Sequence, residues 1–268
     1  MPKTVFFDVD GTLVNTKTGT IPQSALLAIR KLKDRGYRLG IASGRDKSGL
    51  KEISGLDTQM FDGFVLSNGA AVFEQNLVCI YRHTFPDTEI LKVLEFSEKN
   101  NVGLIFETAE ERFAATDVNE YMKLSMEYYH ESQAAPKSWK NKEIVKINAF
   151  QREGFDFSEL RKEIDICIVP CPGYCYDIVP GGVSKSSGIQ ILMDRWGLEA
   201  GNYICFGDHD NDREMIENAK IGVAVKDKYG SVQLQQIAKY TCEAAEKDGI
   251  YRFLLEMALI DEEGEMML

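Results

Sequence analysis

Two aspartates, Asp8 and Asp10, follow a short apolar run near the start of the chain. The run at residues 4–7, TVFF, predicts a buried strand, and side chains at i and i+2 point to the same side of a strand. Carboxylates are rarely buried unless they are paired or hold a metal. We therefore expect both acids to point beyond the carboxyl end of the strand, where ligands bind in open α/β sheets. In isolation, the same pattern could equally be a solvated turn that uses Gly11 for its positive φ.

Two further segments place polar groups where a phosphate or another anion could bind. Residues 37–42 predict a short buried strand that ends at Ser43 and Gly44, just before a helix. A hydroxyl and backbone N–H groups at a helix entrance can form an anion site, although a serine there is more commonly an ordinary N-cap. Lys185 lies in the first turn of a second predicted helix, which extends to Trp196. The helix dipole disfavours a cation in that turn, and a bound anion would compensate.

The fourth segment is the most acidic. Residues 203–207 form another short apolar run, and three carboxylates and an asparagine follow directly. A solvated loop would explain such a sequence in isolation, but it explains it poorly between a core strand and the helix predicted at 213–219. Asp208, Asn211 and Asp212 are therefore candidate site residues.

The order of these motifs resembles the haloacid dehalogenase superfamily of phosphotransferases: D-x-D-G-T, a strand ending in serine, a lysine, and G-D-x-x-N-D. The long insert between Ser43 and Lys185 is similar to that of the Cof-like or IIB phosphatases, which carry a large α/β cap. The resemblance covers essentially the whole chain. It implies an α/β fold in which residues 1–82 and 183–268 form a Rossmann-like, doubly wound parallel sheet core. Residues 83–182 would form an inserted α/β cap domain that determines substrate specificity.

The resemblance also implies roles for the candidate residues. Asp8 would be the nucleophile that forms an aspartyl-phosphate, Asp10 the general acid and then the general base, and Lys185 a third catalytic residue. The other groups would bind Mg²⁺ or the substrate. The implied Mg²⁺ ligands are Asp8, Asp10, Asp208 and Asp212, and the implied groups on the phosphoryl oxygens are Ser43, Gly44, Lys185 and Asn211. The resemblance places the metal beside the acidic loop at residues 208–212, which we call the metal-side loop. His209 and Arg213, in this loop and directly after it, depart from the family pattern.

The resulting hypothesis is a Mg²⁺-dependent phosphatase that hydrolyses small phosphomonoesters, with sugar phosphates first and phosphorylated cofactors next. A sugar phosphomutase of the same superfamily and a non-enzymatic phosphometabolite-binding protein are the alternatives. Asp10 favours hydrolysis, because related P-type ATPases have D-K-T-G-T without the second acid and keep a long-lived aspartyl-phosphate. The cap residues that could contact the leaving group are Arg112, His130, Trp139 and Lys140. Each of them, taken individually, is more often a plain surface or packing residue.

The composition of the chain limits the classes of molecule that the protein is expected to bind. The chain has 268 residues, of which 44% are hydrophobic and 27% charged, values typical of a globular protein. Its net charge of −11 argues against nucleic-acid binding, which needs a basic face. No apolar run approaches membrane-spanning length and no secretion signal is recognised. We therefore expect a cytoplasmic monomer or homodimer with free cysteine thiols, acting on a small phosphate ester, with no membrane or nucleic-acid partner.

Overall fold

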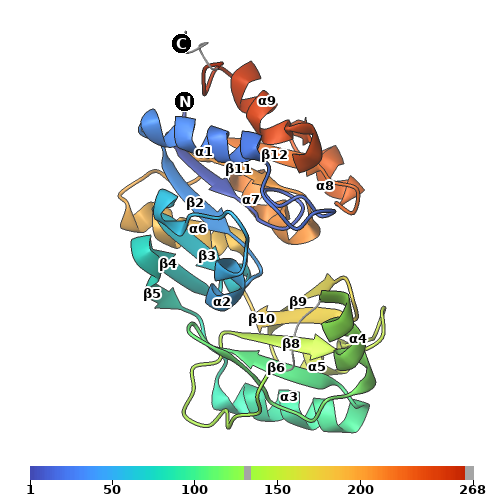
Figure 1. Ribbon diagram of the computed structural model, residues 1–268. Coiled ribbons are helices and arrows are strands. Elements are labelled where there is room, and N and C mark those ends of the chain that lie inside the picture. The colour runs from blue at the N-terminus through green and yellow to red at the C-terminus, as the bar shows by residue number, and fades with distance from the viewer. Residues whose placement is uncertain (130–133, 263–268) are drawn as a thin grey trace.

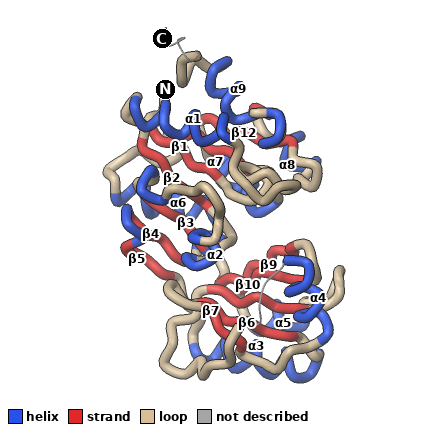
Figure 2. The backbone as a smooth tube through the Cα atoms, in the orientation of Figure 1, coloured by secondary structure: helices blue, strands red, loops and turns tan. Residues whose placement is uncertain are grey.

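The computed structural model describes residues 1–129 and 134–262, and it contains two sheets in two lobes (Figures 1 and 2). The first and last described segments belong to the upper lobe in Figure 1, and the middle of the chain forms the lower one. We call the upper lobe, built on the eight-stranded sheet, the core lobe, and the lower one, built on the five-stranded sheet, the cap lobe.

The core lobe has strands β1 (Thr4–Phe7), β2 (Arg38–Ala42), β3 (Gly63–Leu66), β4 (Ala71–Glu74), β5 (Val78–Arg82), β11 (Ile204–Gly207), β12 (Ile221–Lys226) and β13 (Tyr240–Glu243). Its helices are α1 (Gln23–Asp34), α2 (Lys47–Lys51), α6 (Lys185–Arg195), α7 (Arg213–Asn218), α8 (Val232–Ile237) and α9 (Gly249–Glu256). The cap lobe has strands β6 (Gly103–Glu107), β7 (Arg112–Ala114), β8 (Lys146–Phe150), β9 (Ile166–Cys171) and β10 (Cys175–Pro180), and helices α3 (Asp87–Asn100), α4 (Glu120–Tyr129) and α5 (Ser158–Glu163).

The core sheet has the strand order β13-β12-β11-β1-β2-β3-β4-β5. The six strands from β13 to β3 are parallel, so the predicted α/β class with a parallel sheet core is confirmed. The hairpin of β4 and β5 extends this sheet in the antiparallel sense. As a result, β1 is flanked by β11 and β2, the strands that precede the other polar motifs.

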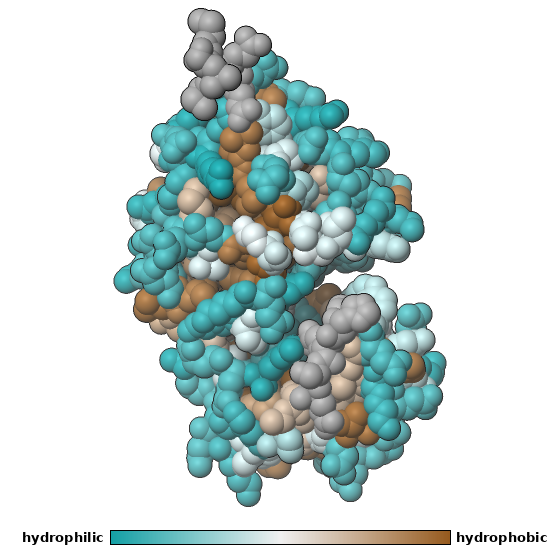
Figure 3. All heavy atoms as spheres, in the orientation of Figure 1, coloured by the Kyte–Doolittle hydropathy of each residue, from teal (hydrophilic) through white to brown (hydrophobic). Residues whose placement is uncertain are grey.

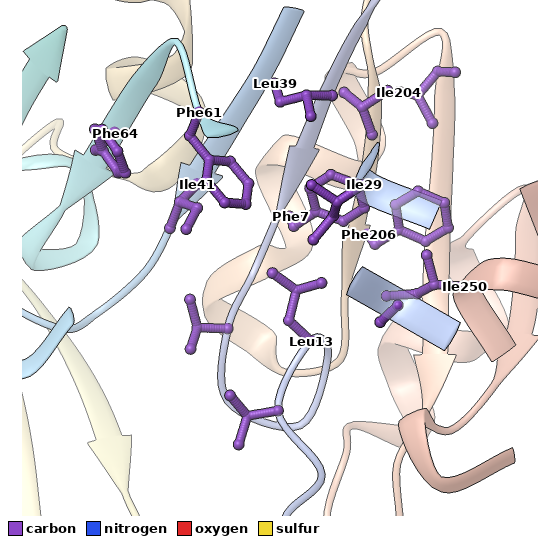
Figure 4. Packing of buried hydrophobic residues seen from close by; sticks show 14 of the residues in the cluster. Phe7, Leu13, Ile29, Leu39, Ile41, Phe61, Phe64, Ile204, Phe206 and Ile250 are labelled. Carbon is purple, nitrogen blue, oxygen red and sulfur yellow. The ribbon is translucent and has the colours of Figure 1, made fainter. Parts of the chain in front are cut away.

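Both faces of the core sheet are covered, as the alternation along β1 requires. Phe7 packs on one face with Ile29 of α1 and Ile250 of α9 (Figure 4). Phe6 points to the opposite face, where it belongs to a second cluster with Ile189 of α6. Both phenylalanines are fully buried, and each burial contributes roughly 1.5–3 kcal/mol. The acids that follow β1 are therefore held by a strand whose four residues are all buried.

The cap sheet is antiparallel, with the order β7-β6-β8-β10-β9. Helices α3 and α5 cover one of its faces through an apolar cluster that includes Ile147 and Tyr176. Side chains alternate between the two faces of a strand, so Lys146, Asn148 and Asp177 lie on the opposite face. Their hydrogen bonds, described below, connect that face to the core lobe.

Local hydrogen bonds set two element boundaries in the cap lobe. α4 begins at Glu120, because the Asn119 side chain accepts a hydrogen bond from the N–H of Met122 at 2.8 Å and caps the helix. β9 begins only at Ile166, because the N–H of Ile164 donates to the carbonyl of Leu160 at 3.1 Å and closes the last turn of α5.

Two further observations concern the cysteines and the helices. All six cysteines are free thiols; Cys175, Cys205 and Cys242 are buried, whereas Cys167 is exposed. Across residues 1–129 and 134–262, every helix is too short or too polar to cross a membrane.

Candidate active site

The carboxylates of Asp8, Asp208 and Asp212 meet at one edge of the core sheet. β1 and β11 are parallel neighbours with Phe7 opposite Phe206, so the residues that follow them share that edge. One oxygen atom from each carboxylate lies within 4.8 Å of the others, and all three side chains are buried. Oxygen ligands grouped in this way suit Mg²⁺ or another hard divalent cation.

Lys185 lies between two of these acids. Its Nζ donates to Oδ1 of Asp8 and to Oδ1 of Asp212, both at 2.6 Å, and the residue is 1% exposed. The lysine is the first residue of α6, because the Ser184 side chain accepts the N–H of Ser187 at 3.2 Å and caps the helix there. The helix start thus delivers a buried cation to the nucleophile candidate.

The metal-side loop is fixed by its own acids. Oδ2 of Asp212 accepts the N–H groups of Asp208 and His209, at 2.9 and 3.0 Å. Oδ1 of Asp208 accepts the hydroxyl of Thr12 at 2.9 Å, which connects the loop to the motif after β1. These bonds hold the carboxylates in place without using all of their oxygen lone pairs.

Two glycines allow the backbone to approach these acids. At Gly11, where φ is +83°, a Cβ would lie 2.3 Å from Oδ2 of Asp208. At Gly207, a Cβ would lie 2.5 Å from Cγ of Asp212. Any larger residue at either position would displace a carboxylate of the cluster.

The cluster carries an excess of negative charge. Burial raises the pKa of Asp8 well above its usual value, and the nearby Lys185 only partly opposes this. Burial also raises the pKa of Asp208, against a hydrogen bond from His209 that lowers it. Burial alone would lower the pKa of Lys185, but Asp212 and Asp8 raise it more, so the lysine stays charged. One buried cation among three buried acids leaves charge that a divalent metal would neutralise, so the residues present fit such an ion.

Ser43 and Gly44 follow β2, on the other side of β1. Ile41 pairs with Phe7, which brings the end of β2 to the same edge as Asp8. The buried hydroxyl oxygen of Ser43 accepts the N–H of Arg45 at 3.1 Å and keeps its own proton to donate. A short polar loop before α2 therefore lies beside the nucleophile candidate.

Asp10 lies outside the three-carboxylate cluster and forms a bidentate ion pair with Arg45. Nη2 and Nε of Arg45 donate to the two Asp10 oxygens at 2.7 and 2.8 Å. The Asp10 side chain is 54% exposed, so it can reach both a substrate and solvent. Sequence reasoning did not assign a role to Arg45, since nothing local links it to an acid 35 residues earlier.

The side chain of Asn211 is connected to the cap lobe through Asn68. Its Nδ2 donates to Oδ1 of Asn68 at 2.9 Å, and Nδ2 of Asn68 donates to Oδ2 of Asp177 at 2.7 Å. Neither Asn68 nor Asp177 was a predicted site residue. The alternation of polar Lys146 and Asn148 with apolar residues along β8 was the available signal for a polar face in a buried strand.

The two departures from the family pattern have different surroundings. Nδ1 of His209 lies 2.5 Å from Oδ2 of Asp208, so the histidine borders the acidic cluster. The hydrogen bond raises the pKa of His209 to about 9, against burial that lowers it. Arg213 turns outward and pairs with Glu217 at 3.1 Å on the surface of α7.

The cap residues proposed from sequence have different surroundings. Trp139 packs against the apolar cluster of the cap lobe, and Lys140 is exposed. Arg112 is opposite Glu107 in the pairing of β7 with β6, and Glu107 is opposite Lys146 in the pairing of β6 with β8, so Arg112 lies on the polar face of the cap sheet. His130 lies outside the described residues. Figure 3 shows a recess between the two lobes on one side of the molecule.

The model of the haloacid dehalogenase-like hydrolases matches residues 5–254. The chain belongs to this family. The match spans both lobes and includes every motif described above. The predicted family is therefore confirmed.

Several curated relatives carry phosphatase names. A Streptococcus pyogenes protein named as a bifunctional phosphatase/peptidyl-prolyl cis-trans isomerase is 29% identical over 97% of this chain, and the chain spans only 55% of that relative's length. The Bacillus subtilis 5-amino-6-(5-phospho-D-ribitylamino)uracil phosphatase YitU is 26% identical, over 95% of this chain and 97% of its own length. The predicted enzyme class, a phosphatase of the haloacid dehalogenase type, is confirmed.

Solved structures show the same arrangement of the fold. The subclass IIB sugar phosphatase BT4131 of this superfamily superposes with a TM-score of 0.80 at 27% identity. The match covers 96% of this chain and 99% of that one. The predicted core with a cap of the IIB type is thereby confirmed.

Proposed function

We propose that this protein is a Mg²⁺-dependent phosphatase that hydrolyses small phosphomonoesters through a phosphorylated Asp8. The observation that carries the proposal is the position of Lys185, 2.6 Å from both Asp8 and Asp212 within a buried cluster of three carboxylates. A purely structural role would not explain three acids buried around one lysine, because burying charge is costly.

Asp8, Asp208 and the backbone carbonyl of Asp10 are the proposed metal ligands, and Asp212 supports the ion through water. Bound Mg²⁺ would neutralise the charge of the acids and of the phosphoryl group. Without that neutralisation, a carboxylate and a phosphate dianion about 4 Å apart repel each other by several kcal/mol at an effective dielectric constant near 20.

The chain's own residues divide the reaction between them. A carboxylate oxygen of Asp8 attacks phosphorus, while the Ser43 hydroxyl, the Gly44 N–H and Lys185 hold the phosphoryl oxygens. Asp10 donates a proton to the leaving alkoxide and then removes one from the water that hydrolyses the aspartyl-phosphate. The bidentate contact from Arg45 keeps both oxygens of Asp10 oriented for these transfers.

The cap, residues 83–182, is the proposed source of substrate specificity. Its polar face carries donors and acceptors of both charges, Lys146, Asn148 and Asp177, next to Gly44. Such a face suits a hydroxyl-rich leaving group, which favours sugar phosphates. The sugar phosphatase and the ribitylaminouracil phosphatase among the similar proteins support a small polyhydroxylated substrate.

Phosphate release from a panel of phosphate esters, with Mg²⁺ present, tests the proposal. Wild-type protein should release phosphate from at least one class of small ester, and Asp8→Asn should release none. A panel on which the wild type and the Asp8 variant behave alike would refute it.

A further inference from the structure

A series of hydrogen bonds between amide and carboxylate groups connects the metal-side loop to the cap lobe through Asn68. Asn211 donates to Asn68 at 2.9 Å, and Asn68 donates to Asp177 at 2.7 Å. Asn68 is 3% exposed and Asp177 is 7% exposed. Asn68 is thus the side chain in this chain of bonds that touches both lobes.

The direction of these bonds is set by the carboxylate. An ionised Asp177 can only accept, so Asn68 must present its Nδ2 to it. The Oδ1 of Asn68 is then left for the metal-side loop, and Asn211 must donate to it. The group at either end of these hydrogen bonds, Asp177 or Asn211, therefore determines how the group at the other end must be oriented.

The backbone of the turn holds Asn68 in the position that its hydrogen bonds to Asn211 and Asp177 require. It lies between β3 and β4 with φ of 56°, in the left-handed region that asparagine, aspartate and glycine tolerate best. A Cβ on Gly44 would lie 3.1 Å from Oδ1 of Asn68 and 3.3 Å from Oδ2 of Asp177. The side chains of Asn68 and Asp177 therefore lie directly against Gly44, in the loop proposed to bind the phosphoryl group.

The cap end of the chain is anchored by neighbours on the same sheet face. Asn148 donates to Oδ1 of Asp177 at 2.7 Å. Lys146 lies 3.0 Å from Glu107 and 3.4 Å from Asp177, and its Nζ donates to the carbonyl oxygen of Gly44 at 2.7 Å. The cap thus contacts two motif loops of the core, directly at Gly44 and through Asn68 at Asn211.

We propose that Asn68 is a positioning residue that orders the metal-side loop when Asp177 of the cap is seated against it. The contact between Asp177 and Asn68 then does more than help the cap to enclose a substrate, because it also fixes the loop that carries Asp208 and Asp212. This inference rests on the proposed function for its effect on turnover, but the coupling itself exists without substrate.

The test uses variants that keep the backbone of the turn. Asn68→Gly removes the side chain at a position with positive φ without adding strain. Asn68→Asp keeps the acceptor for Asn211 but sets two carboxylates against each other. Adding Asp177→Asn to Asn68→Asp restores one donor and one acceptor with the polarity reversed.

Hydrogen exchange in the protein without substrate or metal measures the coupling. The reporters are the N–H groups of Asp208 and His209, which bond to Asp212. Asn68→Gly should speed their exchange roughly 10- to 100-fold, because its buried hydrogen bond to a charged group is lost. Asp177→Asn should also speed it, because an amide has one acceptor oxygen where the carboxylate accepts from both Asn68 and Asn148. The Asn68→Asp, Asp177→Asn double variant should return to within about threefold of wild type.

A matched control lies on the same cap strand. Tyr176 donates to the carbonyl of Arg152 at 2.8 Å on the face covered by α5, away from Asp177. Tyr176→Phe should lower the thermal stability of the cap and leave exchange at Asp208 and His209 unchanged. If Asn68 and Asp177 acted only through the stability of the cap, Tyr176→Phe would also speed exchange at Asp208 and His209.

Turnover of p-nitrophenyl phosphate gives the second measurement. Asn68→Gly should lower kcat roughly tenfold with little change in KM, since Asn68 is not proposed to touch this small ester, and the double variant should recover kcat. Folded Asn68→Gly and Asp177→Asn variants with wild-type exchange, or a double variant no better than Asn68→Asp alone, would overturn the proposal. If wild-type protein hydrolyses no ester, the proposed function fails while the exchange experiment still decides the coupling.

Discussion

The Nζ of Lys185 lies 2.6 Å from Oδ1 of Asp8, although 177 residues separate the two in the chain. α6 brings the lysine to the end of β1, and Asp212 holds it from the other side at 2.6 Å. Both Lys185 and Asp8 are buried. The nucleophile candidate is thus paired with the cation that would hold the transferred phosphoryl group.

Removing this lysine should affect both activity and stability. Lys185→Gln leaves Asp8 and Asp212 buried without their cation, which should lower the free energy of unfolding by about 3–5 kcal/mol in EDTA. Turnover should fall by at least about 10²-fold, as for loss of a preorganised electrostatic contact. Urea unfolding and steady-state kinetics measure the two effects.

Lys247→Gln is the matched control for that variant. Lys247 pairs with Glu243 at 2.7 Å on the surface, with 63% of its side chain exposed. Surface pairs contribute little, so stability and turnover should stay near wild type. Equal losses in both lysine variants would show that the buried site has no special role.

Asp10→Asn should separate phosphorylation from hydrolysis. An amide cannot deprotonate the attacking water, so dephosphorylation should slow by roughly 10²–10⁴-fold. An activated ester needs little acid catalysis and should still phosphorylate the variant. Rapid-quench experiments should therefore find more phosphoenzyme at steady state than in wild type. A variant that turns over at the wild-type rate would exclude Asp10 as the acid and base.

Metal removal should abolish activity. Three carboxylate oxygens within 4.8 Å of one another repel an anionic substrate unless a cation is bound. EDTA should stop turnover, Mg²⁺ should restore it, and Ca²⁺ should restore it poorly because it takes more ligands at longer distances. Mg²⁺ should also raise the melting temperature of wild type, and less so that of Asp208→Asn. Full activity in EDTA would contradict the site as described.

Stability should depend on pH through Glu107 at the junction of the lobes. Burial raises the pKa of Glu107 from about 4.5 to about 7, and Lys146 only partly opposes this. Glu107 therefore binds its proton more tightly in the folded protein than in the unfolded one. Its stabilising contribution is complete below about pH 4.5 and is lost as the pH rises through 7, a difference of about 3 kcal/mol.

Comparison of wild type with Glu107→Gln isolates this effect. The free energy of unfolding should fall between pH 5 and 8 more steeply in wild type than in the variant, because other titrating groups are common to both. Glu111→Gln is the control: Lys137 and Lys142 lower the pKa of Glu111 to about 2, so its contribution changes only below pH 5. Parallel pH profiles for wild type and Glu107→Gln would contradict this prediction.

The core and its motif loops could be predicted because the signals are local. Apolar runs of four or five residues, each followed by polar groups, identify β1, β2 and β11, and parallel strands bring their ends together. The position of Lys185 in its helix also follows from a local cap at Ser184. Such features depend on residues close in sequence and on the general geometry of α/β sheets.

The contacts between the lobes could not be predicted in the same way. Asn68 and Asp177 are 109 residues apart, and their bond exists only because one sheet face lies against the other lobe. No spacing rule relates a turn after β3 to the middle of β10. The alternation in β8 and β10 marks a polar face, but only the folded arrangement shows that this face contacts Gly44 and Asn68.

Covalent labelling of Asp8 is the most direct test of the account. Wild-type protein and Asp10→Asn should be mixed with a labelled activated phosphate ester and Mg²⁺, quenched in acid, and digested for mass spectrometry. The account predicts an acid-stable, base-labile phosphoryl group on Asp8, abundant in Asp10→Asn and absent from Asp8→Asn. Label on another residue, or equal labelling of Asp8→Asn and Asp10→Asn, would contradict it.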